Sequence, residues 1–191
     1  MTDCSDGPVK TRFMVDDKCV LRHDNDKCRL DLTVIRRAAL DRLMSWQPEG
    51  VLLSDYDKGL LAPEFMRQVI AWCAQYSVPC VADAKREPDL YRGAVVKCNE
   101  LYYKVHFEEM RSCVRDWVVT YGSEPPYIQH IKGECVEPLP PVNCLNHVGA
   151  GDCFAAHLIL ALACGFSLKE SAAIAHSAGR VYVQRRHNTP P

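Results

Sequence analysis

Apolar positions along the chain follow two spacings, one typical of helices and one typical of buried strands. From Thr33 the apolar residues recur at helical spacing, and Pro48 and Gly50 end that run. The short, wholly apolar runs that follow are typical of strands buried on both faces. The predicted elements are, in chain order, a strand at 51–54, a helix from Pro63, strands at 78–82 and 94–97, a helix at 101–113 and a strand at 117–120.

Two hairpins and a helical end complete the predicted layout. The first hairpin joins strands at 12–15 and 19–23, and the second joins strands at 127–131 and 134–136. Residues 151–184 are almost all helix-forming. Gly165 is expected to divide them into two helices, and Ser167 to cap the second.

This alternation of strands and helices predicts an α/β fold with a mainly parallel sheet. The 191 residues fit one domain, with a hairpin segment over 1–30 and an α/β core with C-terminal helices over 31–191. In such folds ligands bind at the carboxyl ends of the strands. The polar residues that follow the predicted strands, and should therefore lie along that edge, are Asp55, Asp83, Asn99 and Thr120.

Composition argues against several classes of partner. The net charge is −1, and no basic block longer than a pair precedes Arg185-Arg186, so a nucleic-acid partner is not expected. No apolar stretch approaches the ~20 residues of a membrane span, and the first residues do not resemble a secretory signal. We therefore expect a cytoplasmic protein that does not contact membranes.

Cysteine and histidine residues are numerous but lack metal-binding spacing. None of the 11 cysteines forms a Cys-x-x-Cys pair, and none of the seven histidines forms a His-x-x-x-His pair, so we expect no metal site of the protein's own. Cys73, Cys80 and Cys164 lie in apolar runs and are expected to be buried as small hydrophobic residues.

The segment Gly149-Ala150-Gly151-Asp152 begins the first of the two C-terminal helices. Its glycines allow a ligand to approach the backbone, and free N–H groups at a helix start attract an anion such as phosphate. Asp152 could then accept a proton from an attacking hydroxyl. In the structural alternative, the glycines form a tight turn and Asp152 only caps the helix.

Other phosphate motifs do not fit these residues. A dinucleotide fingerprint would need a third glycine where Phe154 stands, and a Walker loop would need Gly-Lys-Ser/Thr. Cys153 could have a lowered pKa at a helix start, but the neighbouring Asp152 opposes thiolate formation, so a packed thiol is favoured.

The same glycine segment before an Ala-rich helix resembles the C-terminal signature of ribokinase-like (pfkB-type) carbohydrate kinases. Ser54-Asp55-Tyr56-Asp57-Lys58-Gly59 resembles the Ser-Asp-Tyr-x-Lys-Gly segment of one branch, the sugar kinase domain of ADP-heptose synthase. Further matching segments follow in the family's order: Lys10-Thr11-Arg12, Leu21-Arg22-His23-Asp24, Val78-Pro79, Asp83-Ala84-Lys85, Tyr91-Arg92-Gly93-Ala94, Asn99, Val119-Thr120 and residues 175–183.

The resemblance implies a ribokinase-like three-layer sandwich that uses ATP and Mg²⁺ and acts on a sugar phosphate such as a heptose phosphate. It makes Asp152 the catalytic base, and Gly149, Ala150 and Gly151 the anion hole for the transferred phosphoryl group. It places Asn99, Thr120, Gly122 and His176 at the nucleotide, and Asp55, Lys58 and Lys85 on the phosphate and substrate side.

The chain also departs from the family pattern. The family's chain begins well before the segment matched by Lys10, so we expect a fold truncated at its N-terminus that lacks opening strands and part of the sugar pocket. Tyr102 stands where the family has a Glu that helps organise Mg²⁺, Asn146-His147-Val148 replaces Asp-x-Thr, and Tyr121 replaces an Arg.

Two functional hypotheses follow from the resemblance and the departures. One is an active carbohydrate kinase. The other is a non-catalytic nucleotide- or sugar-binding module, or a subunit of an assembly that supplies the missing part. For the second hypothesis, an exposed sheet edge where the missing strands should be would favour a homodimer.

Overall fold

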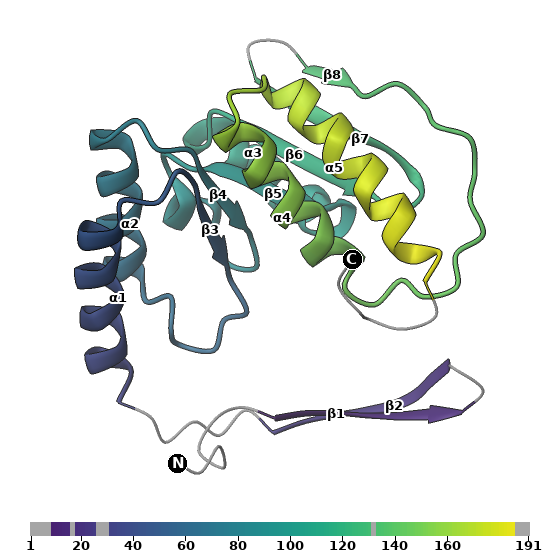
Figure 1. Cartoon of the computed structure of the whole chain (residues 1–191), viewed down its shortest axis with the longest axis horizontal. Helices are drawn as coiled ribbons and strands as arrows, with labels where there is room; N and C mark the ends of the chain where they lie inside the picture. The colour runs from purple at the N-terminus through teal and green to yellow at the C-terminus, as the bar shows by residue number, and fades with distance from the viewer. Residues whose placement is uncertain (1–8, 16–17, 26–30, 131–132, 186–191) are drawn as a thin grey trace.

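The computed structural model describes residues 9–15, 18–25, 31–130 and 133–185, arranged around two separate sheets (Figure 1). The smaller sheet is the antiparallel hairpin of β1 (Val9–Val15) and β2 (Lys18–Asn25), in which Arg12 lies opposite Arg22. This confirms the first predicted hairpin, whose turn at Asp16-Asp17 lies outside the described residues.

The larger sheet has six strands in the order β3-β4-β5-β6-β7-β8. The first four strands are parallel, and the last two continue the sheet in antiparallel pairing. A mainly parallel α/β sheet is therefore confirmed. The strands are β3 (Val51–Ser54), β4 (Cys80–Asp83), β5 (Val95–Asn99), β6 (Trp117–Tyr121), β7 (Glu124–Gln129) and β8 (Gly133–Cys135).

Several strand boundaries differ by one to three residues from the predicted ones, and the local contacts of β4 and β7 explain two of these differences. β4 begins at Cys80 because the Val78 N–H donates to the carbonyl of Cys73, at the end of the preceding helix, rather than to a strand. β7 begins at Glu124 and includes two prolines. Proline cannot donate a backbone hydrogen bond but can still accept one, and the Pro126 carbonyl accepts from the Val136 N–H.

The helices begin with local caps. Asp31 and Asn99 accept backbone N–H groups of the helices that follow them, and Ser167 forms a capping box with Glu170 as its predicted role requires. Gly165, with φ of 86°, separates the last two helices. The helices are α1 (Leu32–Trp46), α2 (Pro63–Gln75), the 3₁₀ turn η2 (Pro88–Tyr91), α3 (Glu100–Cys113), α4 (Ala150–Ala163) and α5 (Leu168–Val183).

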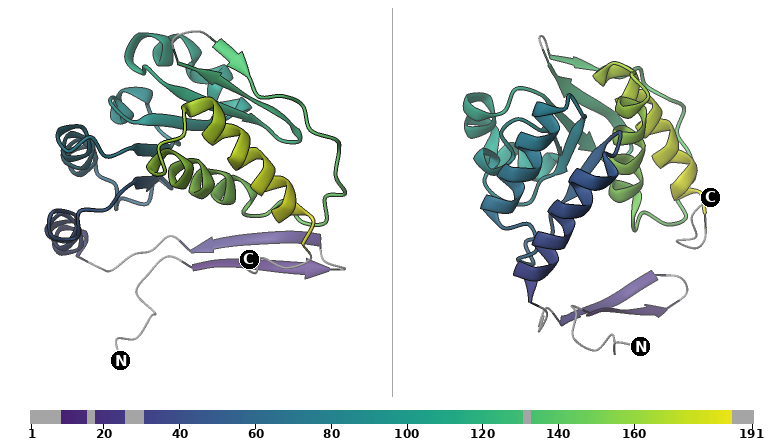
Figure 2. Two further views of the ribbon diagram at one scale, coloured as in Figure 1. Left: turned by 45° about the horizontal axis from the view of Figure 1, so that its top comes forward. Right: turned by 60° about the vertical axis from the view of Figure 1, so that its left-hand side comes forward.

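The sheet lies between two helical layers, each with its own core. Side chains of alternate strand residues point to opposite faces, so Trp117 and Val119 pack with α2 and α3, whereas Val118 packs with α4 and α5. Figure 2 shows α4 and α5 covering one face, with α1 beside α2 at the end of the sheet. The predicted three-layer sandwich is confirmed.

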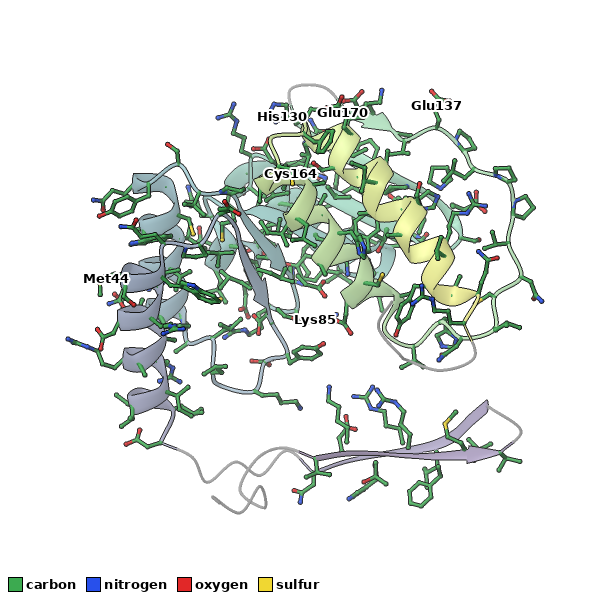
Figure 3. All side chains as sticks on the ribbon, in the orientation of Figure 1. Met44, Lys85, His130, Glu137, Cys164 and Glu170 are labelled. Carbon is green, nitrogen blue, oxygen red and sulfur yellow. The ribbon has the colours of Figure 1, made fainter. Side chains whose placement is uncertain are left out.

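The cysteine prediction holds for two of its three residues. Cys73 and Cys80 are buried, but Cys164 is exposed (Figure 3), so its predicted burial is wrong. Cys164 follows the last turn of α4, where Gly165 directs the chain away from the core. No helix in the described part of the chain is long and apolar enough to cross a membrane.

Candidate active site

The predicted anion-binding segment forms the N-terminus of α4. Gly149 is the N-cap residue, with φ of 87° and no side-chain cap hydrogen bond. A Cβ at this position would stand 2.5 Å from Tyr182 Oη, so both the backbone conformation and the space require glycine. Asp152 is exposed in the first helical turn and does not cap the helix. The interpretation of Asp152 as a mere cap is therefore wrong.

Two cavities meet at this helix start. The larger, of about 1060 Å³, lies between the α4 N-terminus, the carboxyl ends of the parallel strands and the β1–β2 hairpin. Figures 1 and 2 show the hairpin facing this edge of the sheet. The smaller, of about 530 Å³, lies between α5, β7 and the proline-rich segment 138–142. Thr120, His147 and Gly151 line both cavities.

Positive charge exceeds negative charge around the larger cavity. Arg12 and Arg22 reach it from the hairpin, whereas Asp152 borders it at the start of α4. The cavity is thus suited to an anionic ligand. Its basic residues are Lys10, Arg12, Arg22, Lys85 and Lys97, and its acidic residues are Asp83 and Asp152.

Lys97 is a site residue that sequence reasoning missed. Its Nζ lies 3.1 Å from the Asp83 carboxylate, and both side chains are more than nine-tenths buried. A Cβ on Gly151 would lie 3.2 Å from that Nζ, so the ammonium lies directly beside the glycine turn. A lysine inside an otherwise apolar strand was the available signal, because such a residue is rarely buried without a partner.

Asp152 is hydrogen-bonded to a tyrosine from the loop after β3. Tyr56 Oη donates to Asp152 Oδ1 at 2.9 Å. Partial burial, and next the hydrogen bond to Asp152, raise the pKa of Tyr56 above its ordinary value. The Lys10 ammonium lies 4.4 Å from the centre of the Tyr56 ring, within the range of a cation–π contact.

Cys153, the next residue of α4, also lines the larger cavity. Burial raises the pKa of its thiol, which agrees with the packed thiol favoured from the sequence. His157 Nδ1 lies 2.8 Å from the Cys153 carbonyl oxygen, one turn back along the helix.

Asp55 does not line either cavity, although it follows β3 as predicted. It is 2 % exposed and accepts hydrogen bonds from Tyr91 Oη at 2.6 Å and from Arg86 Nε at 2.9 Å. Lys58 is exposed and is not a lining residue either, whereas Lys85 borders the larger cavity (Figure 3). Of the three residues expected on the phosphate and substrate side, only Lys85 lines one of these two cavities.

The residues expected at a nucleotide are divided between the cavities. Gly122 and His176 line the smaller one, Thr120 lines both, and Asn99 lines the larger one while also capping α3. Burial, with a smaller effect of the Arg180 charge, lowers the pKa of His176 below its ordinary value. Proline rings and the His176 imidazole are among the groups that line the smaller cavity.

The described residues do not form a metal cage. No three His, Cys, Asp or Glu side chains among them are grouped so as to hold an ion. Tyr102, at the position where a Glu was expected, donates its hydroxyl to the Arg86 carbonyl oxygen. Mg²⁺ in kinases is commonly held by one or two carboxylates and by substrate phosphates. The two carboxylates that line the larger cavity are already engaged, Asp83 with Lys97 and Asp152 with Tyr56.

Sequence comparison finds relatives along most of the chain. Residues 97–191 match the model of the pfkB family carbohydrate kinase. The bifunctional protein HldE of Mesorhizobium japonicum is 31 % identical over 205 residues, which cover 93 % of this chain and 40 % of that protein. HldE of Campylobacter jejuni is 26 % identical, with 93 % and 42 % covered. The chain thus spans about two fifths of these relatives.

Solved structures of low identity share the fold. Adenosine kinase of Trypanosoma brucei brucei superposes with a TM-score of 0.72 at 15 % identity, covering 94 % of this chain and 64 % of that one. Arabidopsis thaliana ribokinase, in a complex with ribose and ATP, gives a TM-score of 0.62 at 18 % identity, covering 87 % and 60 %. Through residues 97–191 this chain belongs to the pfkB family of carbohydrate kinases, and its fold as a whole is ribokinase-like.

Proposed function

We propose that this protein transfers the γ-phosphate of ATP to a hydroxyl of a sugar that already carries a phosphate, as a heptose phosphate does. The observation that carries the proposal is the position of Asp152. It stands on the first turn of α4, where the two cavities meet at Gly151. A nucleotide in the smaller cavity and an acceptor in the larger one would face each other at this point.

In the proposed reaction, the acceptor hydroxyl loses its proton to the Asp152 carboxylate as its oxygen attacks the γ-phosphorus. A new O–P bond forms, the bond to the β-phosphate oxygen breaks, and ADP leaves. The N–H groups of Gly149 and Gly151 and the Lys97 ammonium would neutralise charge developing on the phosphoryl oxygens. The Ala150 N–H, also expected in the anion hole, donates to the His147 carbonyl at 3.1 Å and would have to exchange that partner for the phosphoryl group. Mg²⁺ bound to the nucleotide would supply further charge neutralisation.

The charge of the larger cavity supports a phosphorylated acceptor. Arg12 and Arg22 lie directly opposite each other on the hairpin, and both line the cavity. Two guanidinium groups on the same wall of the cavity favour an anionic ligand. Arg22 also donates to Asp24 at 2.8 Å, which holds its guanidinium in place.

The test compares phosphoryl transfer with nucleotide binding. Asp152→Asn should lower kcat by about 10²- to 10⁴-fold, because it removes the general base, while calorimetry gives ATP affinity within about threefold of the parent. Asp89→Asn is the matched control, since Asp89 is an exposed partner of Arg92. Phosphorylated sugars should be used in preference to the same sugars without phosphate. Unchanged transfer by Asp152→Asn would overturn the mechanism.

The second candidate function is a module that binds nucleotide or sugar without turnover. Tyr102 favours it, because its hydroxyl is engaged with the Arg86 carbonyl oxygen where a metal-organising carboxylate was expected. ATP binding lost in Asn99→Ala, with no ADP formed in the presence of any sugar phosphate, would support the module. Turnover of ATP would exclude it.

A homodimer formed through a sheet edge remains part of the proposal. β3 is the terminal strand of the larger sheet in the described part of the chain, and its residues Val51 and Leu52 are half-buried. An unpaired strand edge favours pairing with another chain. Light scattering after size exclusion should give twice the monomer mass of 21.5 kDa, and a clean monomer would count against this arrangement.

A further inference from the structure

The loop that carries Tyr56 is anchored to the core by its neighbour. Asp55 Oδ1 accepts the Asp57 N–H at 2.8 Å, while Asp55 Oδ2 accepts Tyr91 Oη at 2.6 Å. Arg86 adds an ion pair to the same carboxylate at 2.8 Å, with its side chain mostly buried. The chain on either side of Tyr56 is thus held in one conformation, and the Tyr56 ring is delivered to a defined place at the cavity.

At that place the ring connects two elements that lie far apart in the sequence. Its hydroxyl donates to Asp152 on α4, and its face lies against the Lys10 ammonium on β1. All three residues line the larger cavity. The hairpin, the loop after β3 and the start of α4 therefore meet through one aromatic side chain.

These contacts have consequences for a carboxylate acting as a base. A hydrogen bond to Oδ1 limits rotation of the Asp152 carboxylate and leaves Oδ2 for the acceptor hydroxyl. A cation over the ring withdraws electron density from the phenol, so the hydroxyl becomes a better donor. Restricted rotation and a stronger hydrogen bond both help to hold the Asp152 carboxylate in one orientation. Tyr56 can have these effects without touching the acceptor.

We propose that Tyr56 is a positioning residue for Asp152, and that Lys10 holds the Tyr56 ring, so that the base is fully oriented only when the hairpin lies over the cavity. This inference rests on the proposed function. It adds a link between the hairpin that covers the acceptor side and the group that removes the acceptor's proton.

Kinetics of matched variants test the link. Tyr56→Phe keeps the ring and removes the donor, and it should lower kcat by roughly tenfold, equivalent to about 1.4 kcal/mol, with ATP affinity unchanged. Lys10→Met should lower kcat by about two- to fivefold. Tyr76→Phe is the control, because Tyr76 is similarly exposed but its ring contacts Trp72, and it does not line the cavity.

Double variants separate positioning from direct contact with the acceptor. The double variant Asp152→Asn with Tyr56→Phe should have the same kcat as Asp152→Asn alone. The double variant Tyr56→Phe with Lys10→Met should have the same kcat as Tyr56→Phe alone. A full tenfold loss in the Asp152→Asn background would mean that Tyr56 acts on the acceptor itself, and it would overturn the proposal. The same holds if Tyr56→Phe turns over at the parent rate.

A second readout requires no turnover. Carbon-13 labelling of the tyrosine Cζ atoms allows the Tyr56 phenol to be titrated by NMR, with its signal assigned by its loss in Tyr56→Phe. Asp152→Asn should lower the pKa of Tyr56, and Asp89→Asn should not change it, because Asp152 contributes to the raised value. An unchanged pKa of Tyr56 in Asp152→Asn would refute the positioning contact, even if the protein transfers no phosphate. If the pKa shifts but the protein transfers no phosphate, the contact stands and only the proposed function is refuted.

Discussion

Lys97 and Asp83 form a buried ion pair between two adjacent parallel strands. They lie directly opposite each other in the register of β4 and β5, with Nζ and Oδ1 3.1 Å apart. Alternation along β5 places Val96 and Cys98 on the α2 and α3 face, and Lys97 on the face covered by α4. The pair therefore fixes a cation beneath the start of α4.

Replacing the lysine should reveal how strongly the pair is coupled to folding. Lys97→Met leaves the Asp83 carboxylate buried without a partner, and it should lower the free energy of unfolding by about 3 kcal/mol in urea denaturation. Lys104→Met removes a lysine from an exposed pair with Glu100 and should leave the free energy of unfolding close to that of the parent.

The double variant Lys97→Met with Asp83→Leu should recover most of that loss, since neither charge then remains in the core. If Lys97→Met were no more destabilised than Lys104→Met, the carboxylate would have access to water and the pair would not be buried as described.

Two glycine-to-alanine substitutions should have opposite effects on stability. At Gly149, φ of 87° and the nearby Tyr182 hydroxyl oppose a side chain, so Gly149→Ala should destabilise the protein by about 1–3 kcal/mol and weaken ATP binding. At Gly179, within α5, an added Cβ meets no atom within 4 Å, so Gly179→Ala should stabilise it by about 0.5–1 kcal/mol. Thermal unfolding measures both, and equal melting temperatures would contradict the geometry at Gly149.

The raised pKa of Tyr91 predicts that the protein loses stability in alkaline solution. Burial, and next the hydrogen bond to Asp55, raise the pKa of Tyr91 to about 12 from 10.0. Because the folded protein holds this proton more tightly than the unfolded chain, the stabilisation is complete below pH 10 and is lost between pH 10 and about 12. Over that range the parent should lose roughly 2–3 kcal/mol more than Tyr91→Phe in urea denaturation, and parallel curves for the two proteins would refute this.

Local sequence signals were sufficient for the elements and their order. Apolar strands, proline at the start of α2 and polar caps such as Ser167 act over a few residues, and the structure follows them. An observed boundary differs from the predicted one where a contact outside the segment determines the structure. This is the case at Val78, whose N–H donates to a carbonyl at the end of α2.

The candidate site was only partly predictable. The glycine segment and Asp152 lie at a helix start, which the motif indicates directly. Asp55 and Asp83 both follow the strand-end rule, but only Asp83 reaches the cavity, because Arg86, 31 residues away, pairs with Asp55. No local pattern indicates that partner, and none places the hairpin over the cavity.

The wall shared by the two cavities has a consequence for inhibitor design. Thr120, His147 and Gly151 border both spaces, so ligands held in them would be in near contact at Gly151. A single compound that joins an adenosine polyphosphate to an anionic sugar would lose its translational and rotational freedom only once. Such a bisubstrate compound should bind more tightly than either part alone.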